Sequence, residues 1–263
     1  MPLPTSSLII STYNWPEALE LCLLSVARQK IQPSEVIIAD DGSGEKTRKV
    51  IERFENTLTV PLIHVWHDDR GFRKTEILNK AIKQSSAAYI IQIDGDVILH
   101  PYFIKDHLQI SERNAFVRGT RARLTKQMTE ETLASKKTDF TALSRGVYHR
   151  LNAIRIPVFK ALGIRKEMRS RSVRGSNLAF WKSDFVLVNG YNSDLQGWGH
   201  EDEELAARFI NNRIIKKIVK LSAVQYHLHH EESSRDLESL HSITLENTVK
   251  NTIKSCANGY SCN

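Results

Sequence analysis

The stretch Tyr89-Ile90-Ile91-Gln92-Ile93-Asp94-Gly95-Asp96 indicates the fold most directly. Its first five residues form a short, nearly continuous apolar run, which is typical of a strand buried on both faces of a parallel sheet. Comparable runs lie at residues 8–13, 35–40 and 62–66, and helical patterns lie between them at 16–30, 45–54 and 74–83. Because strands that alternate with helices form βαβ units, we predict an α/β fold with a mostly parallel central sheet flanked by helices.

Polar residues follow every one of these strands. They are Thr12-Tyr13-Asn14, Asp40-Asp41-Gly42-Ser43, His67-Asp68-Asp69 and Asp94-Gly95-Asp96. In an open sheet of this kind, ligands bind in the crevice beyond the carboxyl ends of the strands. We therefore expect these side chains, and the acids above all, to share one rim of the sheet and to form a binding site there.

Asp94 and Asp96 are the candidate metal ligands on this rim. Gly95 between them permits a ligand to approach the backbone closely. Two hard oxygen ligands in an open turn suit Mg²⁺ or Mn²⁺ shared with a diphosphate. Acid-x-acid triplets also occur in ordinary surface turns, but this one follows a buried strand and is expected on the rim that carries Asp40 and Asp41, which favours a functional site.

Two other phosphate-binding patterns fail. Gly44-Glu45-Lys46-Thr47 resembles the end of a P-loop, but Ala39 stands where that motif requires its first glycine. No predicted strand runs into a glycine triplet with the spacing of a dinucleotide-binding turn. The sequence therefore argues against a P-loop enzyme and against a NAD-dependent enzyme.

A second polar group lies in Gly197-Trp198-Gly199-His200-Glu201-Asp202, before a helix that we expect to run to about residue 217. Acids at a helix N-terminus complement its macrodipole by about 0.3–1 kcal/mol each, which accounts for Glu203 and Glu204. That explanation leaves Trp198 between two glycines unexplained. An aromatic face beside carboxylates suits a sugar ring, because its C–H face stacks while its hydroxyls donate to the acids.

Three histidines follow a strand predicted at residues 219–226. The alternation of a strand places His227 and His229 on the same side. One of them, or His230, could complete a metal site begun by Asp96, and packing or surface exposure is the alternative for each. No cysteine pair has the spacing of a closed zinc site.

Composition narrows the class of protein. With 41% hydrophobic and 25% charged residues, the 263-residue chain has enough apolar material for a core, which excludes a largely disordered protein. No apolar run approaches the roughly 20 residues that span a bilayer, so we expect a soluble protein. Three cysteines cannot form a disulfide framework, and free thiols fit a reducing cytoplasm.

Positive charge is concentrated at residues 113–174, which hold sixteen Lys and Arg but four Asp and Glu. The residue pattern of this segment predicts some helix and little strand. Its charge indicates an anionic surface or substrate, with a solvated surface as the alternative. No zinc-finger, RNA-binding or basic-zipper pattern accompanies it, so we expect no nucleic-acid partner. The tail from residue 233 predicts one amphipathic helix with an apolar face of Leu237, Leu240, Leu245 and Val249.

Taken together, these motifs resemble a known family. Residues 8–16, residues 36–43 and Asp94-Gly95-Asp96 resemble the inverting glycosyltransferases of family 2, which have the GT-A nucleotide-diphospho-sugar transferase fold. Residues 175–204 are similar to the acceptor half of β-1,4-galactosyltransferases and bacterial chondroitin polymerases. That half combines a glycine-rich strand, an Asn-Gly-aromatic turn and Trp-Gly-x-Glu-Asp. Gly71-Phe72-Arg73-Lys74 resembles the donor-side helix of the same group.

The resemblance covers roughly residues 6–105 and 173–232 and implies a single GT-A domain over the whole chain. Within it, residues 1–105 would be the nucleotide-sugar-binding half and residues 106–232 the acceptor-binding half. Residues 233–263 would be a C-terminal helical tail.

The same resemblance implies roles for individual residues. The donor-binding residues would be Thr12, Tyr13 and Asp41 for the base and ribose, Arg73, Lys74 and Asn79 on the donor side, and Asp94 for the ribose or diphosphate. The metal, Mn²⁺ or Mg²⁺, would be held by Asp96 and His227, with His230 as the second choice. Asp202 would be the general base. The residues that hold the acceptor sugar would be Trp198, Glu201, Gly199 and Asn177.

The implied activity is the inverting transfer of a hexose, with galactose or N-acetylgalactosamine favoured, from a UDP-sugar to a glycan or lipid-linked glycan acceptor. The implied setting is the synthesis of bacterial surface polysaccharide or lipopolysaccharide. The protein would be cytoplasmic or at the inner face of the membrane, where the basic segment would contact anionic lipid. Two alternatives stay open: a metal-dependent nucleotide-sugar hydrolase or nucleotidyltransferase, and a non-catalytic sugar-binding module.

Overall fold

The computed structural model describes residues 3–159, 161–231 and 237–262, and its central feature is a large mixed sheet. The strand order is β3-β2-β1-β4-β10-β6-β11-β9. The parallel part consists of β3 (Leu62–Trp66), β2 (Glu35–Asp40), β1 (Ser6–Thr12) and β4 (Tyr89–Asp94). The remainder consists of β10 (Leu178–Trp181), β6 (Ala115–Arg118), β11 (Ile215–Val219) and β9 (Ile164–Glu167). β10 pairs antiparallel with both β4 and β6, so it joins the two parts into one sheet.

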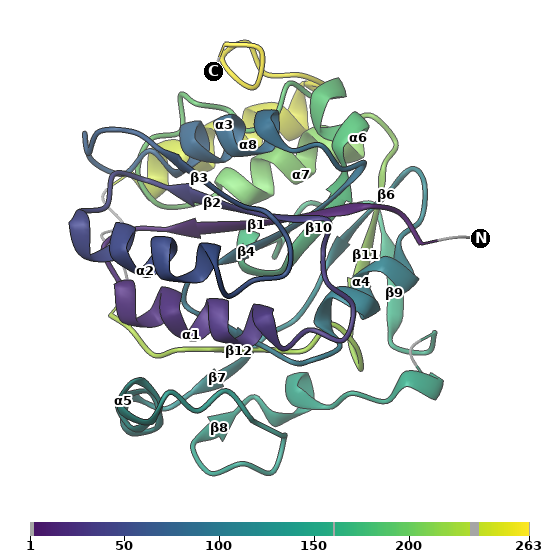
Figure 1. Cartoon of the computed structure of the whole chain (residues 1–263). Helices are drawn as coiled ribbons and strands as arrows, with labels where there is room; N and C mark the ends of the chain where they lie inside the picture. Colours follow the sequence, from purple (N-terminus) through teal and green to yellow (C-terminus); the bar gives the residue numbers. More distant parts are fainter. Residues whose placement is uncertain (1–2, 160, 232–236, 263) are drawn as a thin grey trace.

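Helices cover both faces of this sheet (Figure 1). One face carries α1 (Pro16–Ala27), α2 (Glu45–Glu55) and α4 (Phe103–Ile110). The other carries α3 (Lys74–Gln84), α6 (Lys182–Leu187) and α7 (Glu201–Asn211), and α8 (Glu238–Lys250) packs on α7. The predicted α/β fold with helices flanking a central sheet is therefore confirmed. Parallel pairing holds for the strands of the first 94 residues and for β6 with β11, whereas β10 and β9 run antiparallel.

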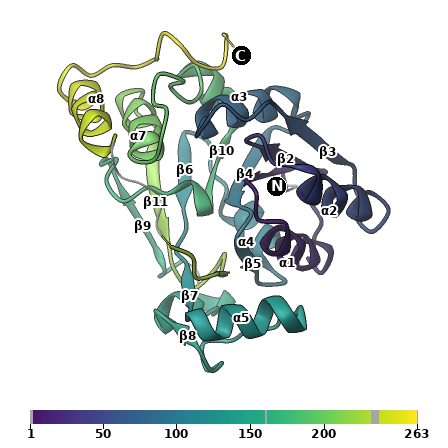
Figure 2. The ribbon, with the colours of Figure 1, turned by 90° about the vertical axis from the view of Figure 1, so that its left-hand side faces the viewer.

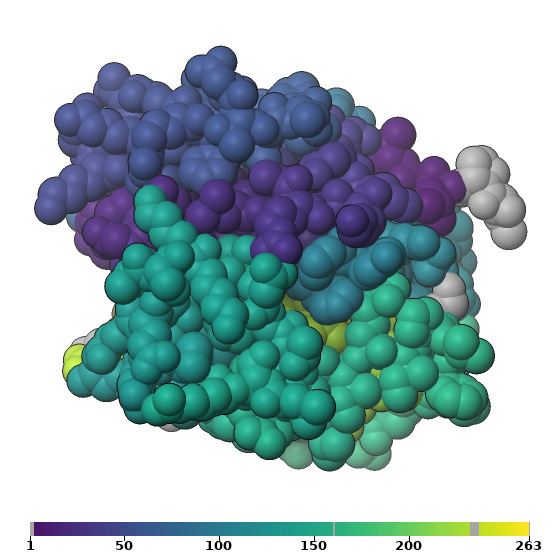
Figure 3. Space-filling view, turned by 60° about the horizontal axis from the view of Figure 1, so that its bottom comes forward, coloured from purple at the N-terminus to yellow at the C-terminus, as the bar shows by residue number. Residues whose placement is uncertain are grey.

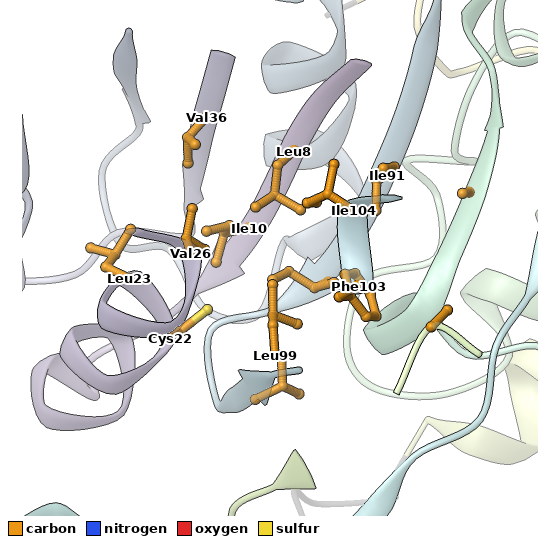
Figure 4. Packing of buried hydrophobic residues seen from close by; sticks show 14 of the residues in the cluster. Leu8, Ile10, Cys22, Leu23, Val26, Val36, Ile91, Leu99, Phe103 and Ile104 are labelled. Atoms are coloured by element: carbon orange, nitrogen blue, oxygen red, sulfur yellow. The ribbon is translucent and has the colours of Figure 1, made fainter. Parts of the chain in front are cut away.

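The core explains why the strands are continuous apolar runs. Figure 4 shows Leu8 and Ile10 of β1 on the face that packs against Cys22 and Val26 of α1. Ile9, between them in sequence, belongs to the cluster on the opposite face. Because side chains alternate along a strand, a strand covered on both faces must be apolar at every position. Full burial of each such side chain contributes about 1.5–3 kcal/mol.

A second, smaller sheet lies below α1 in Figure 1 and has the order β5-β12-β7-β8. Its strands are β5 (Val97–Leu99), β12 (Gln225–His227), β7 (Ala122–Leu124) and β8 (Val147–Tyr148), and α5 (Lys126–Ser135) packs beside them (Figure 2). In the pairing of β12 with β5, His227 lies opposite Val97. The smaller sheet therefore brings the histidine stretch next to Asp96, which is distant in sequence.

Three expectations about local structure are wrong. The strand predicted at 219–226 is split, because Leu221 and Ala223 adopt positive φ angles of 61° and 49° and only residues 225–227 form β12. The helix expected to reach residue 217 ends at Asn211, because Arg213 turns the chain with φ 64° and β11 follows. The basic segment, for which little strand was expected, contains β6, β7, β8 and β9.

The tail helix forms where it was expected, but its predicted apolar face is not the buried one. Leu240 and Val249 are more than half exposed. His241 and Thr248 face inward instead, with His241 Nδ1 2.7 Å from Gly199 O and Thr248 Oγ1 donating to Glu204 over 3.1 Å. Residues 232–236 of the predicted tail lie outside the described residues. Within the described part of the chain, no helix is both long and apolar enough to cross a bilayer.

Candidate functional site

A cavity of about 430 Å³ opens at the carboxyl ends of β1 and β4. Residues from the first 96 positions and residues from position 121 onward line it. The first part contributes the polar residues Thr12, Tyr13, Asp41, Lys74, Asp94 and Asp96. The later part contributes Arg121, Arg123, Tyr148, Trp198, His227 and His230. Of the four strand ends that were expected to share a rim, those of β1, β2 and β4 therefore meet at this cavity, whereas residues 67–69 after β3 do not line it.

Lys74 lies between two groups of acids. It begins α3, and its Nζ is 2.8 Å from Oδ1 of Asp94, which also accepts a hydrogen bond from Ser11 Oγ over 2.9 Å. Burial alone lowers the pKa of Lys74, but the charges of Asp94, Asp202 and Glu201 outweigh it and raise that pKa above its ordinary value. One cation thus interacts with the acid at the end of β4 and with both acids at the start of α7.

Asp96, His227 and His230 form a cluster suited to a metal ion. His227 Nε2 lies 3.3 Å and His230 Nε2 3.1 Å from Asp96 Oδ2. One ligand atom from each of the three residues lies within 4.8 Å of the others. The second oxygen, Asp96 Oδ1, is buried without a hydrogen-bond partner among the described residues. A buried carboxylate oxygen without a partner is costly, so the donor set fits a bound cation.

The electrostatics of this cluster keep Asp96 ionised. Burial raises the pKa of Asp96, but the charge of His227 and the hydrogen bond from His230 outweigh it and hold that pKa at about 2. The carboxylate is a ligand that Mg²⁺ and Mn²⁺ share, whereas imidazole suits later transition ions better than Mg²⁺. One carboxylate with two imidazoles therefore fits Mn²⁺ better than Mg²⁺.

Asp202 is held by hydrogen bonds at both of its carboxylate oxygens. Gly175 N donates to Oδ2 over 2.6 Å, and Tyr191 Oη donates to Oδ1 over 2.8 Å. Burial, together with the charge of Asp94, raises the pKa of Asp202, although Lys74 and these hydrogen bonds oppose the rise. A carboxylate that is oriented in this way and more basic than usual is equipped to accept a proton.

Gly175 explains the close approach of Asp202. A Cβ at this position would lie 2.5 Å from Gln92 Nε2 and 2.7 Å from Asp202 Oδ1. Only glycine leaves room for the carboxylate to reach the backbone N–H of residue 175. The glycine that opens the second ordered block of the sequence is therefore required by the contact with Asp202.

Glu201 is buried at the first position of α7, next to Asp202. Its Oε2 accepts a hydrogen bond from Gly199 N over 3.0 Å. Burial and the negative charge of Asp202 raise the pKa of Glu201 to about 7, against the opposing charge of Lys74. Glu201 can therefore hold a proton near neutral pH, and its titration depends on the charge of Asp202.

Trp198 lines the cavity from the loop before α7. Its neighbours Gly197 and Gly199 have φ angles of 93° and 120°, a region that favours glycine. The two glycines thus carry the indole out of the path of the helix and into the cavity wall, where an aromatic face can stack on a sugar ring.

Thr12, Tyr13 and Asp41 also line the cavity. Tyr13 is 52% exposed and its Oη donates to Asp69 over 2.9 Å. Asp41 is buried, with His67 Nε2 2.7 Å from its Oδ1. Burial raises the pKa of Asp41, and the contact with His67 opposes that rise. An exposed aromatic side chain together with a fixed carboxylate suits the binding of a base and a ribose.

Several predicted site residues, Glu201 and Asp202 among them, are not among the residues that line this cavity. Arg73 Nη1 bonds to Glu76 over 3.1 Å, while the neighbouring Lys74 faces the cavity. Asn79 is fully buried and bonds to the backbone N and O of Tyr191, so it positions the turn that carries that tyrosine. His229 is exposed and lines the cavity, but it is not part of the metal cluster.

The two remaining acceptor-side predictions also have structural contacts. Asn177 is buried, with its Oδ1 2.9 Å from His107 Nε2 and its Nδ2 donating to Thr120 O and Ala223 O. Gly199 contributes backbone groups, an N–H to Glu201 and an O facing His241. Both residues support the loops around Asp202 and Glu201.

The sequence did not predict that Arg121, Arg123 and Tyr148 line the cavity. It also did not predict that Tyr191 donates a hydrogen bond to Asp202. The arginines lie in the basic segment, whose charge was the only signal, and the sequence did not single out particular positions. Tyr191 was recognised only as part of an Asn-Gly-aromatic turn. Its contact with α7 depends on the packing of that turn against α3 through Asn79.

Two family models match the chain. One described as glycosyl transferase family 2 matches residues 7–169, which is more than half of the chain. One described as the N-terminal domain of galactosyltransferase matches residues 158–231.

Curated relatives match over most of this chain but over only part of their own length. A validoxylamine A glucosyltransferase from Streptomyces hygroscopicus subsp. limoneus is 29% identical, over 78% of this chain and 48% of the relative. The chondroitin synthase of Escherichia coli is 24% identical, over 84% of this chain and 34% of the relative. The hyaluronan synthase of Pasteurella multocida is 25% identical, over 91% of this chain and 26% of the relative. The chain thus spans at most about half the length of these proteins.

Solved structures share the fold. TarS residues 1–349 from S. aureus, in complex with UDP, superpose with a TM-score of 0.63 at 16% identity, covering 98% of this chain and 68% of that one. GalNAc-T7 with UDP, GalNAc and Mn²⁺ superposes with a TM-score of 0.67 at 16% identity, covering 93% of this chain and 48% of that one. The fold is that of the GT-A glycosyltransferases.

Proposed function

Because this chain belongs to glycosyl transferase family 2, we propose that it transfers a hexose from a UDP-sugar to a glycan acceptor with inversion at the anomeric carbon. Galactose or N-acetylgalactosamine is the favoured hexose. One observation carries the proposal: Lys74, which lines the cavity, interacts both with the acid at the end of β4 and with the acid pair at the start of α7. Donor-side and acceptor-side groups are thus close enough to act on one sugar.

The donor lies on the side of Thr12, Tyr13 and Asp41, which hold the base and ribose, and of Lys74 and Asp94. The cavity volume of about 430 Å³ is in the range of sites that bury a small ligand. UDP is bound to TarS and to GalNAc-T7, whose fold this chain shares. Likeness of fold supports a UDP-sugar donor here.

Asp96, His227 and His230 hold Mn²⁺, with Mg²⁺ as the weaker fit. The orphaned Oδ1 of Asp96 and the imidazoles around Oδ2 support this assignment. When bound, the ion supplies positive charge that stabilises the leaving nucleoside diphosphate. Arg121 and Lys74, on the wall of the same cavity, contribute further positive charge.

Asp202 is the general base for the acceptor. Its carboxylate takes the proton of the acceptor hydroxyl, the hydroxyl oxygen bonds to the anomeric carbon, and the bond from that carbon to the diphosphate oxygen breaks. The electron pair of the broken bond leaves with the diphosphate. Attack from the opposite face converts an α-linked donor into a β-linked product. Trp198 and Glu201 hold the acceptor sugar, by stacking and by hydrogen bonding.

We assign residues 1–105 to the nucleotide-sugar half, residues 106–232 to the acceptor half and residues 233–263 to a supporting tail. β10, from the acceptor half, pairs with β4, so the two halves share one sheet. The likeness to the chondroitin and hyaluronan synthases supports a role in a bacterial surface polysaccharide or lipopolysaccharide. Free thiols at Cys22, Cys256 and Cys262 support the cytoplasm as its location.

The basic segment contacts the anionic inner face of the membrane, where a lipid-linked acceptor would be found. Figure 3 shows this segment, coloured teal and green, covering the lower part of the molecular surface in view. Large apolar side chains in it are strongly exposed, namely Leu143, Leu151, Val158 and Leu162. Apolar side chains interspersed with arginines suit a headgroup layer, and co-sedimentation with phosphatidylglycerol vesicles, but not phosphatidylcholine vesicles, tests the contact.

A donor screen tests the proposed reaction. Each nucleotide sugar is incubated with Mn²⁺ or with a chelator, with and without oligosaccharide acceptors, and the released nucleoside diphosphate is measured. We expect acceptor-stimulated, metal-dependent release from a UDP-hexose and a β-linked product by NMR. Equal release with and without acceptor indicates the hydrolase, and binding without turnover across the panel indicates the sugar-binding module.

A further inference from the structure

A second cavity, of about 390 Å³, lies beside the donor cavity and is strongly cationic. Its basic side chains are Arg118, Arg121, Arg123, Arg174 and Lys220. The other lining residues are neutral at pH 7 or histidine, and no Asp or Glu is among them. Of the described residues, none carries a carboxylate within ion-pair distance of these five cations.

The cations in this cavity repel one another. Burial and the charge of Arg174 lower the pKa of both Arg118 and Arg121. Arg121 donates from Nη1 to Ser176 Oγ over 3.3 Å, but its buried Nε has no hydrogen-bond partner within the described chain.

The charge of Glu167 opposes the lowering of the pKa of Arg118. The charges of Asp94 and Asp96 oppose the same lowering for Arg121. None of these carboxylates pairs directly with either side chain. Gathering like charges without a direct ion pair is unfavourable, and a guanidinium presents a fork of donors that matches carboxylate or phosphate oxygens.

This cavity is on the acceptor side of the reaction centre. Arg121 and Arg123 line both cavities, so the two share a wall. Ser176, which also lines the second cavity, follows Gly175, whose N–H binds Asp202. A group bound in the second cavity is therefore connected through one short turn to the proposed base.

We propose that the cationic cavity binds the negatively charged group, a carboxylate or a phosphate, of the acceptor, and that the acceptor is accordingly an anionic glycan. The identification of the bound group as part of the acceptor rests on the proposed function. The proposal that this cavity binds an anion rests only on its five basic side chains.

The variant that tests this is Arg174→Gln with Lys220→Gln. Both side chains are exposed and lie outside the donor cavity, so the variant should fold and bind UDP normally. A matched control is Lys126→Gln with Arg145→Gln, which removes the same charge from two exposed residues of the basic segment that line neither cavity.

Transfer is measured with neutral, uronate-terminated and phosphate-bearing oligosaccharides. We expect wild type to prefer one anionic acceptor, and which one identifies the group as carboxylate or phosphate. In the test variant, kcat/KM for that acceptor should fall by about 10–100-fold, as expected for lost charge-assisted contacts. Neutral acceptors, UDP affinity and the control variant should be unchanged. Equal use of neutral and anionic acceptors by wild type, or an undiminished preference in the test variant, overturns the proposal.

Direct binding separates this inference from the proposed reaction. Glucuronate and inorganic phosphate are titrated into wild type and both variants, with UDP and Mn²⁺ present, by calorimetry. Binding that is lost only in the Arg174/Lys220 variant supports the anion site even if no acceptor is glycosylated. No binding of either anion to wild type overturns the site, whatever the transfer assays show. Weaker UDP binding in the test variant would assign these cations to the donor instead.

Discussion

Tyr191 Oη donates a hydrogen bond to Oδ1 of Asp202 over 2.8 Å, opposite the hydrogen bond that Gly175 N donates to Oδ2. The same hydroxyl also contacts the side chain of Gln92 in β4, so the acid at the start of α7 is connected to the central sheet. Both oxygens of the proposed base are therefore held in one orientation.

Tyr191→Phe tests whether this orientation matters. The hydroxyl bond lowers the pKa of Asp202, so its loss should raise that pKa further. A base is active only when ionised, so the acidic limb of the kcat profile should shift to higher pH. We expect kcat to fall about 10-fold at neutral pH, with the KM for donor unchanged. An unshifted limb contradicts a positioning role.

Asp202→Asn removes the proposed base while keeping the shape of the side chain. Turnover should fall by about 10²–10⁴-fold, because the acceptor proton has no carboxylate to receive it. Donor affinity, measured by calorimetry with UDP and Mn²⁺, should be retained. The matched control is Glu203→Gln, one position further along α7, whose charge is not among those that act on Lys74. Near-normal turnover in Asp202→Asn would remove this residue from the mechanism.

Glu201→Gln should stabilise the protein at alkaline pH. The pKa of Glu201 rises from an ordinary 4.5 to about 7 on folding, so the folded state retains a proton that the unfolded state has lost. The stability from this group is complete below about pH 4.5 and is lost as pH rises through 7. Glutamine cannot ionise and can still accept from Gly199 N.

We therefore expect the free energy of unfolding of Glu201→Gln to exceed that of wild type by roughly 1–3 kcal/mol at pH 8. At pH 4.5 the difference should vanish. Urea unfolding at both pH values measures it. A difference that does not depend on pH is inconsistent with the buried-charge explanation.

Asp96→Ala and His227→Ala test the metal site. Each should weaken Mn²⁺ binding, and UDP binding in the presence of Mn²⁺, by roughly 10–100-fold or more, because a direct ligand costs at least as much as a supporting residue. His229→Ala is the matched control for Mn²⁺ binding, since this neighbouring histidine lines the same cavity but lies outside the cluster. Calorimetry with and without Mn²⁺ distinguishes the variants. Unchanged Mn²⁺ affinity in Asp96→Ala would exclude the proposed ion site.

Much of this protein follows from local sequence. The parallel strands β1 to β4 and the helices between them are encoded by short apolar runs and by 3.6-residue patterns, because burial on two faces of a sheet or on one face of a helix leaves those signatures. The polar residues after β1, β2 and β4 also follow, since the carboxyl end of each strand is a local property and parallel strands share one edge.

Contacts between distant residues decided the rest. Lys74, the first residue of α3, lines the cavity and pairs with Asp94, whereas Arg73 before it bonds to Glu76 instead. His227 and His230 reach Asp96 because β12 pairs with β5, a match across about 130 residues that no local pattern specifies. The arginines of the basic segment become a cavity only when β6, β7 and the loop before β10 are brought together. Residue types and strand ends were set by sequence, whereas the partners of each charge were set by the tertiary fold, because electrostatic interactions depend on distances in space and on burial.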